Sequence, residues 1–325
     1  MTKPSARSPG SASPSARWPL IGRSARNRKP PESARLRTRS WIPLWAGLLT
    51  LGAAAAEVPP ADAARLLRQR LVVLQPQMQR SPFGMRLLLE SVERHHDVRG
   101  DVYAVLPHPL ADVARALEGA AQWCDVLILH LNVKQCEPTA KGLALNVGRK
   151  HDEPLAATYA LELARQIVAQ TPEYLRLEMS AASGPLGSRD YRFVLEAVAA
   201  EGGQTFVHFQ YAYGYGLAAR LAMQVYFSAQ GSTKIGFSPE VPGAGDRSAR
   251  IGGLRGSLER NTMRYHLAIA SYLDSLAQPP EQRVEWRLRD WFAATERFAA
   301  QLHEVELDEY LRMKRSQLRR SGSLR

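Results

Sequence analysis

The residues that could carry chemistry are a few histidines, and they form no catalytic motif. His303 is followed by Glu304, but the second histidine of a zinc-binding HExxH helix is missing. His95, His96 and Asp97 could bind a metal at a surface loop, although adjacent histidines point in different directions and a solvated turn is the simpler interpretation. There is no GxSxG elbow, paired CxxC or phosphate loop. We therefore predict no catalytic residue, no metal site and no cofactor.

Two other histidines and one glycine-rich segment could belong to a site. His130 and His208 lie in apolar segments that we predict to be strands; either could be a polar group in a pocket, or an ordinary hydrogen-bonded core histidine. Residues 252–256 are rich in glycine and precede a predicted helix, whose N-terminus could hold an anion with help from Arg250 and Arg255. The alternative is a plain flexible loop, which could also close over a cavity.

Cys124 and Cys136 are the two cysteines of the chain, and an oxidising compartment would favour pairing them. Residues 125–132 between them are mostly apolar and are predicted to form a strand. Such a strand, fully extended, spans about 26 Å, whereas the Cα atoms of a disulfide lie about 5.5 Å apart. A disulfide, worth roughly 3 kcal/mol, therefore requires a bend within 125–135. Two buried free thiols are the alternative.

Alternating apolar residues predict antiparallel strands through the middle of the chain. Residues 191, 193, 195 and 197 share one face of a strand, and residues 207, 209, 211 and 213 share one face of the next. Gly202 and Gly203 supply the turn between these two strands. Further strands are predicted at 85–92, 100–106, 125–132, 141–148, 156–168, 173–181 and 234–237.

The strongest predicted helix covers residues 257–276, with Ser257 as its N-cap and two prolines after its end. Residues 217–227 fit a helix or a strand, and we favour a helix. A last helical region, 283–313, contains Trp286, Trp291, Phe292 and Phe298. We expect this region to dock on the domain or on a partner. Contact with a membrane surface, helped by the basic end 312–325, is the alternative.

The net charge of +12 is concentrated at the two ends of the chain. Residues 1–40 carry +9 and residues 312–325 carry +6, while the span between them carries −3. A nucleic-acid-binding domain is expected to have a basic face on its folded part. The slightly acidic body therefore argues against nucleic acid as a partner.

The N-terminal residues have the pattern of a secretory signal. Residues 1–40 form a basic leader rich in Ser, Pro and Arg, which we expect to be disordered. Residues 41–56 form an uncharged apolar run that ends in four alanines, as at a signal-peptide cleavage site. This run is shorter than the about 20 residues that a spanning helix needs. We predict a periplasmic or secreted protein; an N-terminal anchor in the inner membrane is the alternative.

The predicted order of elements resembles the START-like, or SRPBCC, helix-grip superfamily. That order is a strand, a helix, a run of antiparallel strands and a long amphipathic helix, and it covers residues 85–277. The segments Gly100-Asp-Val-Tyr-Ala-Val and Leu258-Glu-Arg-Asn-Thr-Met-Arg-Tyr add to the resemblance. It implies an α+β fold in which a curved antiparallel sheet wraps around helix 257–276 and encloses an apolar cavity. Residues 57–84 would be an N-terminal helix and linker, and residues 281–325 a C-terminal helical extension with a basic tail.

The resemblance implies that the protein binds or transports a lipid or other hydrophobic small molecule in the cell envelope, without catalysis. Each residue that it would place at the cavity could equally be plain core. The candidate lining residues are Trp123, Val207, Phe209, Tyr211, Tyr213, Tyr265 and Ile269.

Two other functions remain open. An enzyme of cyclase or hydrolase type would need His130, His208 or Tyr211 to face the cavity beside a carboxylate. An envelope scaffold would bind a partner through its C-terminal helices, so that deleting residues 281–325 would abolish assembly and leave the fold intact.

Overall fold

The computed structural model describes residues 58–229, 234–240 and 249–321. The predicted leader and signal peptide, and the last residues of the basic tail, lie outside these ranges. Within the described ranges, no helix has both the length and the apolar character to cross a bilayer.

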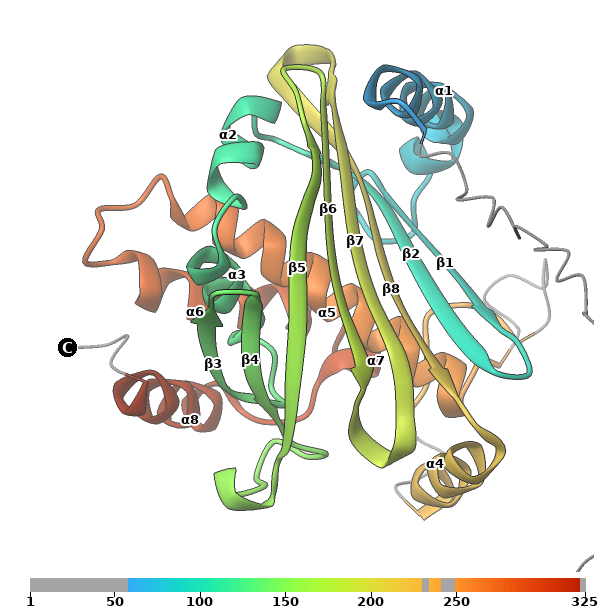
Figure 1. The fold of residues 1–325 in the computed structure, drawn as a ribbon, viewed down its shortest axis with the longest axis vertical. Coiled ribbons are helices and arrows are strands. Elements are labelled where there is room, and N and C mark those ends of the chain that lie inside the picture. Colours follow the sequence, from blue (N-terminus) through green and yellow to red (C-terminus); the bar gives the residue numbers. More distant parts are fainter. Residues whose placement is uncertain (1–57, 230–233, 241–248, 322–325) are drawn as a thin grey trace, which may run out of the picture. The chain divides into compact units, whose positions relative to one another are not determined.

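One eight-stranded antiparallel sheet organises the fold (Figure 1). All neighbouring strands are consecutive in the chain except β2 and β8, whose pairing joins two distant segments. Strands β1 and β3 are therefore the two edges of the sheet. The strand order is β1 (Leu87–Glu93), β2 (Asp97–Leu106), β8 (Gln204–Tyr215), β7 (Ser188–Ala200), β6 (Tyr174–Ser183), β5 (Tyr159–Gln170), β4 (Gly142–Val147) and β3 (Val133–Thr139).

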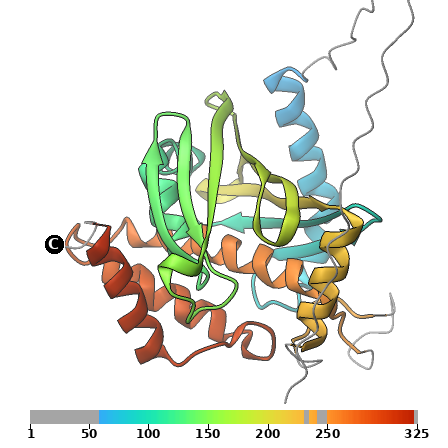
Figure 2. The same cartoon turned by 60° about the horizontal axis from the view of Figure 1, so that its bottom comes forward.

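The two faces of the sheet bury different helices because side chains alternate along each strand. Odd-numbered residues of β7 and β8, such as Phe193 and Phe209, belong to the main core. Even-numbered Val198 and Phe206 belong to a second, smaller core with α1 (Pro60–Gln79). Figure 2 shows the sheet bending around α5 (Gly253–Ser275), which packs against β1, β2 and β8. The fold is thus a helix-grip α+β fold, as predicted.

The C-terminal region forms three helices rather than one: α6 (Arg283–Glu296), α7 (Ala299–Leu302) and α8 (Leu307–Arg320). Trp291 is 1% exposed and stacks on Tyr310 with ring centroids 5.2 Å apart, and its indole N–H donates to the Arg264 carbonyl at 3.1 Å. The partly buried Phe292 and Phe298 pack against the same core. These aromatic residues point into the domain.

The predicted strand 125–132 is wrong: the segment is the end of α3 (Ala120–Leu127) followed by a turn. A short apolar run fits a buried helix as well as a strand, so the sequence pattern did not separate them. A shorter helix, α2 (Leu110–Ala116), precedes α3, and β3 returns the chain after the turn. This reversal is the bend that the cysteines require. Cys124 and Cys136 form a disulfide with Cα atoms 5.3 Å apart.

Residues 234–237, predicted as a strand, are held in a different way. The carbonyls of Lys234 and Ile235 accept hydrogen bonds from Arg260 at 2.9 and 3.2 Å, and the Phe237 amide donates to Glu259 at 2.6 Å. The Gly236 amide donates to the Ile251 carbonyl at 2.6 Å. Side chains of α5 and the backbone before α5 therefore hold this segment together, and it pairs with no strand of the sheet. Residues 217–227 are helical, as favoured, within α4 (Leu217–Ala229).

Candidate functional site

A cavity of about 150 Å³ lies between the inner face of the sheet and α5. Strands β7 and β8 contribute Tyr191, Phe193, Tyr211 and Tyr213, and α5 contributes Tyr265. A dry cavity of this volume holds a single benzene-sized molecule. It is smaller than the about 300–1,000 Å³ of pockets for drug-sized ligands. The remaining wall has an aliphatic part and a polar part. The aliphatic part comes from Leu127, Leu145, Val147, Leu161, Pro185, Leu186 and Met223, and the polar part from His130, Asn132, Arg149, Ser188, Ser257 and Asn261.

Tyr265 organises the aromatic part of the wall. Its ring lies 5.2 Å from Phe193 and 5.3 Å from Tyr211, both in edge-to-face geometry. Phe193 and Tyr211 are themselves 4.8 Å apart. Edge-to-face pairs gain about 0.5–1.5 kcal/mol beyond the area that they bury. The helix side chain therefore closes an aromatic box whose other walls are sheet residues.

Three tyrosine hydroxyls of this box have no hydrogen-bond partner among the described residues. They belong to Tyr211, Tyr213 and Tyr265, whereas the Tyr191 hydroxyl lies 2.8 Å from the Ser188 hydroxyl. Burial, and then the neighbouring tyrosines, raise the pKa of Tyr211 and Tyr213 well above 10. Burial likewise raises the pKa of Tyr265. The hydroxyls are therefore neutral and can donate a hydrogen bond. Buried tyrosine hydroxyls usually have a partner, so these three are available to a guest.

His130 lies at one end of the cavity and is held as the neutral ring. The Asn132 amide donates to Nδ1 at 3.1 Å, so Nε2 carries the proton and donates to Asn261 Oδ1 at 3.2 Å. Burial, reinforced by Arg264 and Lys314, lowers the pKa of His130 to about 3. The ring stacks on Tyr265 at 4.9 Å. The structure places His130 in the turn after α3, not in the strand predicted from the sequence.

Similarity to known proteins was sought at the level of sequence and of structure. No protein-family profile and no curated protein matches the sequence. Ara h 8.0201 aligns over 55% of this chain and 99% of its own, with 12% identity and a TM-score of 0.31. A conserved protein of unknown function, EF2215 from Enterococcus faecalis, aligns over 77% of this chain and 98% of its own (6% identity, TM-score 0.27). CalU16 from Micromonospora echinospora aligns over 64% of this chain and 94% of its own (10% identity, TM-score 0.24).

No family is assigned on these values. All three TM-scores lie below 0.5, so the fold class follows from the strand order and the gripped helix of this chain alone. The function has to be argued from the site itself.

The candidate lining residues separate into two groups. Tyr211, Tyr213 and Tyr265 line the cavity. Val207 and Phe209 share their strand face but lie in the packed core outside the cavity lining, as do Trp123 and Ile269. Trp123 donates its indole N–H to the Leu117 carbonyl at 2.9 Å.

Some lining residues were not among the candidates. Tyr191 and Phe193 carry the same alternation as Tyr211 and Tyr213, and that signal was sufficient to include them. Asn261 comes one turn before Tyr265 on α5, but its polar side chain gave no sequence signal.

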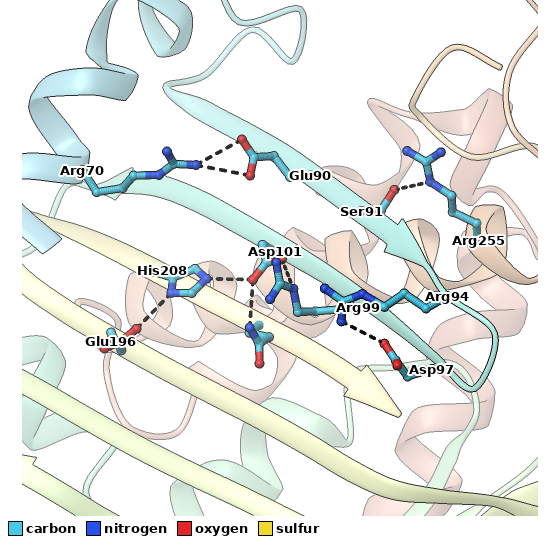
Figure 3. Close-up of polar contacts among 11 residues, drawn as sticks. Arg70, Glu90, Ser91, Arg94, Asp97, Arg99, Asp101, Glu196, His208 and Arg255 are labelled. Atoms are coloured by element: carbon cyan, nitrogen blue, oxygen red, sulfur yellow. Dashed lines mark hydrogen bonds and ion pairs between the residues drawn. The ribbon is translucent and has the colours of Figure 1, made fainter. Parts of the chain in front are cut away.

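His208 lies on the opposite face of the sheet, away from the cavity (Figure 3). Its Nε2 is 2.9 Å from Asp101 Oδ1 and its Nδ1 is 3.0 Å from Glu196 Oε2. Asp101 is also paired with Arg99 at 2.9 Å. Burial opposes the charged ring, but the two carboxylates outweigh it and raise the pKa of His208. The carboxylate partners therefore belong to His208 on the outer face of the sheet, and not to His130 at the cavity on the inner face.

The other candidate groups are occupied by structural contacts. His303 Nδ1 lies 3.0 Å from Glu296, and no group of three metal-binding side chains occurs in the part of the chain that the structure describes. Arg255, in the glycine-rich segment, donates to the Ser91 hydroxyl at 2.8 Å, and Arg250 donates to the Phe237 carbonyl at 2.7 Å. These arginines tie the start of α5 to its neighbours.

Proposed function

We propose that this protein binds a small, neutral, mostly apolar molecule in the cavity between β7, β8 and α5, and does not transform it. The observation that carries the proposal is the set of three tyrosine hydroxyls without a partner among the described residues, in a wall that is mainly, though not wholly, aromatic and aliphatic. Apolar walls favour burial of the guest by about 25 cal/mol per Å². Hydroxyls without a protein partner select a guest that carries a hydrogen-bonding oxygen or nitrogen.

The size and chemistry of the lining support a ring-sized guest over a whole lipid. A volume of about 150 Å³ matches one six-membered ring with a small substituent. No Asp or Glu lines the cavity, His130 is neutral, and the charged lining residue Arg149 is paired with Glu153 at 2.6 Å. The enzyme hypothesis needs a cavity histidine beside a carboxylate. These lining residues do not form such a pair. The disulfide supports work in an oxidising compartment such as the cell envelope.

A pair of matched ligands tests the proposal. Acetophenone and α-methylstyrene have nearly the same shape, but only the ketone accepts a hydrogen bond. We expect saturable binding of both in titration calorimetry or ligand-observed NMR, with the ketone binding more tightly. Changing Tyr211, Tyr213 and Tyr265 together to Phe should remove that preference. Each lost hydrogen bond is worth about 0.5–1.5 kcal/mol, or roughly 2- to 10-fold in affinity.

Tyr103 supplies the matched control. It lies on the outer face of the sheet, where its ring stacks on His208 at 4.5 Å, so Tyr103→Phe removes a hydroxyl away from the cavity. This variant should keep the preference for the ketone. Failure of both ligands to bind at millimolar concentration, or an equal preference in the triple variant and the unchanged protein, would refute the proposal.

A further inference from the structure

Helix α4 exposes a row of aliphatic side chains at the surface. Leu217, Leu221 and Val225 are 73%, 55% and 68% exposed. Their spacing of four residues places them on one face of the helix. Single exposed apolar residues are ordinary on protein surfaces, but a contiguous row marks an interaction site.

The opposite face of α4 covers the cavity. Ala219 and Met223 are 8% and 5% exposed, and Met223 lines the cavity wall. The helix also packs on α5 and on the turn η2 (Pro185–Gly187), two of whose residues, Pro185 and Leu186, line the cavity as well. One side of this helix therefore faces the proposed guest and the other faces the surroundings.

The charged residues on and near α4 are few and paired. The helix contains no Asp or Glu, and Arg220 is its one charged residue. Arg220 keeps 34% of its side chain exposed and lies 3.8 Å from Glu93. Arg189, 56% exposed, comes two residues after η2 and lies 3.5 Å from Asp190. Amphipathic helices with aliphatic residues on one side and arginine at the margin lie in the plane of a membrane interface.

We propose that α4 is a membrane-docking helix, which rests on a lipid bilayer through Leu217, Leu221 and Val225. Three aliphatic side chains expose only a fraction of the about 800 Å² per partner that a stable protein interface buries. A bilayer accepts so narrow a row, because its apolar interior is continuous. The docking does not depend on the cavity function. If both hold, the cavity lies beneath the helix that meets the phase in which apolar small molecules accumulate.

Site-specific fluorescence tests the docking in the full chain. Because the two native cysteines are paired, a single new thiol can be labelled with bimane, whose emission reports a move from water into lipid. Leu221→Cys carries the probe on α4, and Val73→Cys, 63% exposed on α1, is the matched control. A third probe at Arg319→Cys on α8 examines the basic C-terminal surface. Local probes report each surface separately from any binding by residues 1–57.

Vesicles of phosphatidylglycerol and phosphatidylethanolamine, with and without brominated acyl chains, provide the readout. We expect a blue shift and strong bromine quenching at position 221, at least severalfold weaker quenching at positions 73 and 319, and loss of the 221 signal when Leu217→Glu is added. Vesicles of phosphatidylcholine alone should give a similar signal, because the proposed contact is apolar and the nearby arginines are paired with Glu93 and Asp190. An unchanged emission at 221, or equal quenching at all three positions, would overturn the proposal.

Ligand titration in solution keeps the two proposals separate. The Leu217→Glu variant should bind acetophenone as the unchanged protein does, because position 217 is exposed and lies outside the cavity lining. A variant that loses vesicle contact but binds the ketone supports the docking alone. Vesicle contact at 221 in a protein that binds neither ligand would leave the docking intact and refute the cavity function.

Discussion

At the scale of single residues, His208 on the outer face of the sheet has a carboxylate partner at each of its two ring nitrogens. Both ring nitrogens are within hydrogen-bond distance of carboxylates, which only the protonated ring can satisfy as a double donor. Burial works against charged Glu196, yet its hydrogen bonds from His208 and Tyr174 lower its pKa to about 2. His208, Asp101 and Glu196 thus favour one another's charged forms, and this cluster should contribute its full stability only while all three are ionised.

The cluster predicts a particular dependence of stability on pH. Because folding raises the pKa of His208 above its ordinary 6.5, its contribution is complete below pH 6.5 and is lost as the pH rises through the folded-state pKa. The contribution of Glu196 is complete above its ordinary 4.5 and is lost as the pH falls toward 2. We expect the free energy of unfolding, measured by urea titration from pH 5 to 9, to fall above pH 6.5. In His208→Gln that fall should be much smaller; an identical slope in both proteins would show that the cluster is not the cause.

The residues of the site show where sequence reasoning stops at this scale. A period of two is local to a strand, so alternation correctly placed Tyr211 and Tyr213 on the inner face. The same period puts His208 on the outer face, and this could have excluded it as a cavity residue. Alternation could not separate Val207 from Tyr211, because the part of the inner face that α5 leaves unfilled depends on how the helix crosses the sheet.

At the scale of elements, α8 holds the corner between α3 and β3. Lys314 is fully buried and donates to the carbonyls of His130 and Val133 at 2.7 and 2.9 Å and to Gln317 at 3.0 Å. The Tyr310 hydroxyl donates to the Leu129 carbonyl at 3.0 Å. The Leu129 and His130 carbonyls lie in the turn after α3, and Val133 begins β3. A helix that is distant in the sequence thus satisfies the turn that carries the cavity histidine.

Removing the lysine should destabilise this corner. Lys314→Met keeps the length of the side chain but leaves two buried carbonyls without their donor, at a cost of about 1–3 kcal/mol each. We expect a loss of roughly 3 kcal/mol in the free energy of unfolding and faster amide hydrogen exchange in α8 and around residues 128–133. Arg312→Met, at an exposed position of the same helix, should change stability by less than about 0.5 kcal/mol. Equal effects of the two variants would contradict this role of Lys314.

A helix or strand could be predicted from the sequence where its own residues carry the signal. The long strands between residues 159 and 215 alternate strongly, and helix 257–276 has its own stripe and stop signal, so each was found. Residues 126–131 are all buried and, except for His130, apolar, and this removes the periodicity that tells a helix from a strand. The backbone of residues 234–237 forms hydrogen bonds with Arg260 and Glu259, which lie about 25 residues further along the chain.

At the scale of the whole molecule, the C-terminal helices are part of the main core. Leu288, Trp291, Tyr310, Leu311 and Leu318 are each 3% exposed or less and join the same cluster as the sheet and α5. Full burial of such side chains contributes about 1.5–3 kcal/mol each. Their sum, on the order of 10 kcal/mol, is comparable to the about 5–15 kcal/mol of net stability of a typical protein.

A truncation experiment follows from this comparison. A chain that ends at Pro280 should not fold, as judged by loss of near-ultraviolet circular dichroism and of a cooperative thermal transition. Removing only residues 322–325 should leave both unchanged. The scaffold hypothesis requires the opposite result, a stable fold without residues 281–325, so a cooperative transition in the shorter chain would favour that hypothesis.

The open ends of the sheet bear on how these molecules behave when crowded together. An uncovered edge strand offers free backbone groups to a neighbouring copy, which can add a strand and start aggregation. Edge strand β3 carries Pro138, which has no amide hydrogen to donate, and edge strand β1 carries Glu90 and Glu93. The proline on one edge strand and the carboxylates on the other discourage two copies from pairing edge to edge into fibrils, although both edges of the sheet stay open.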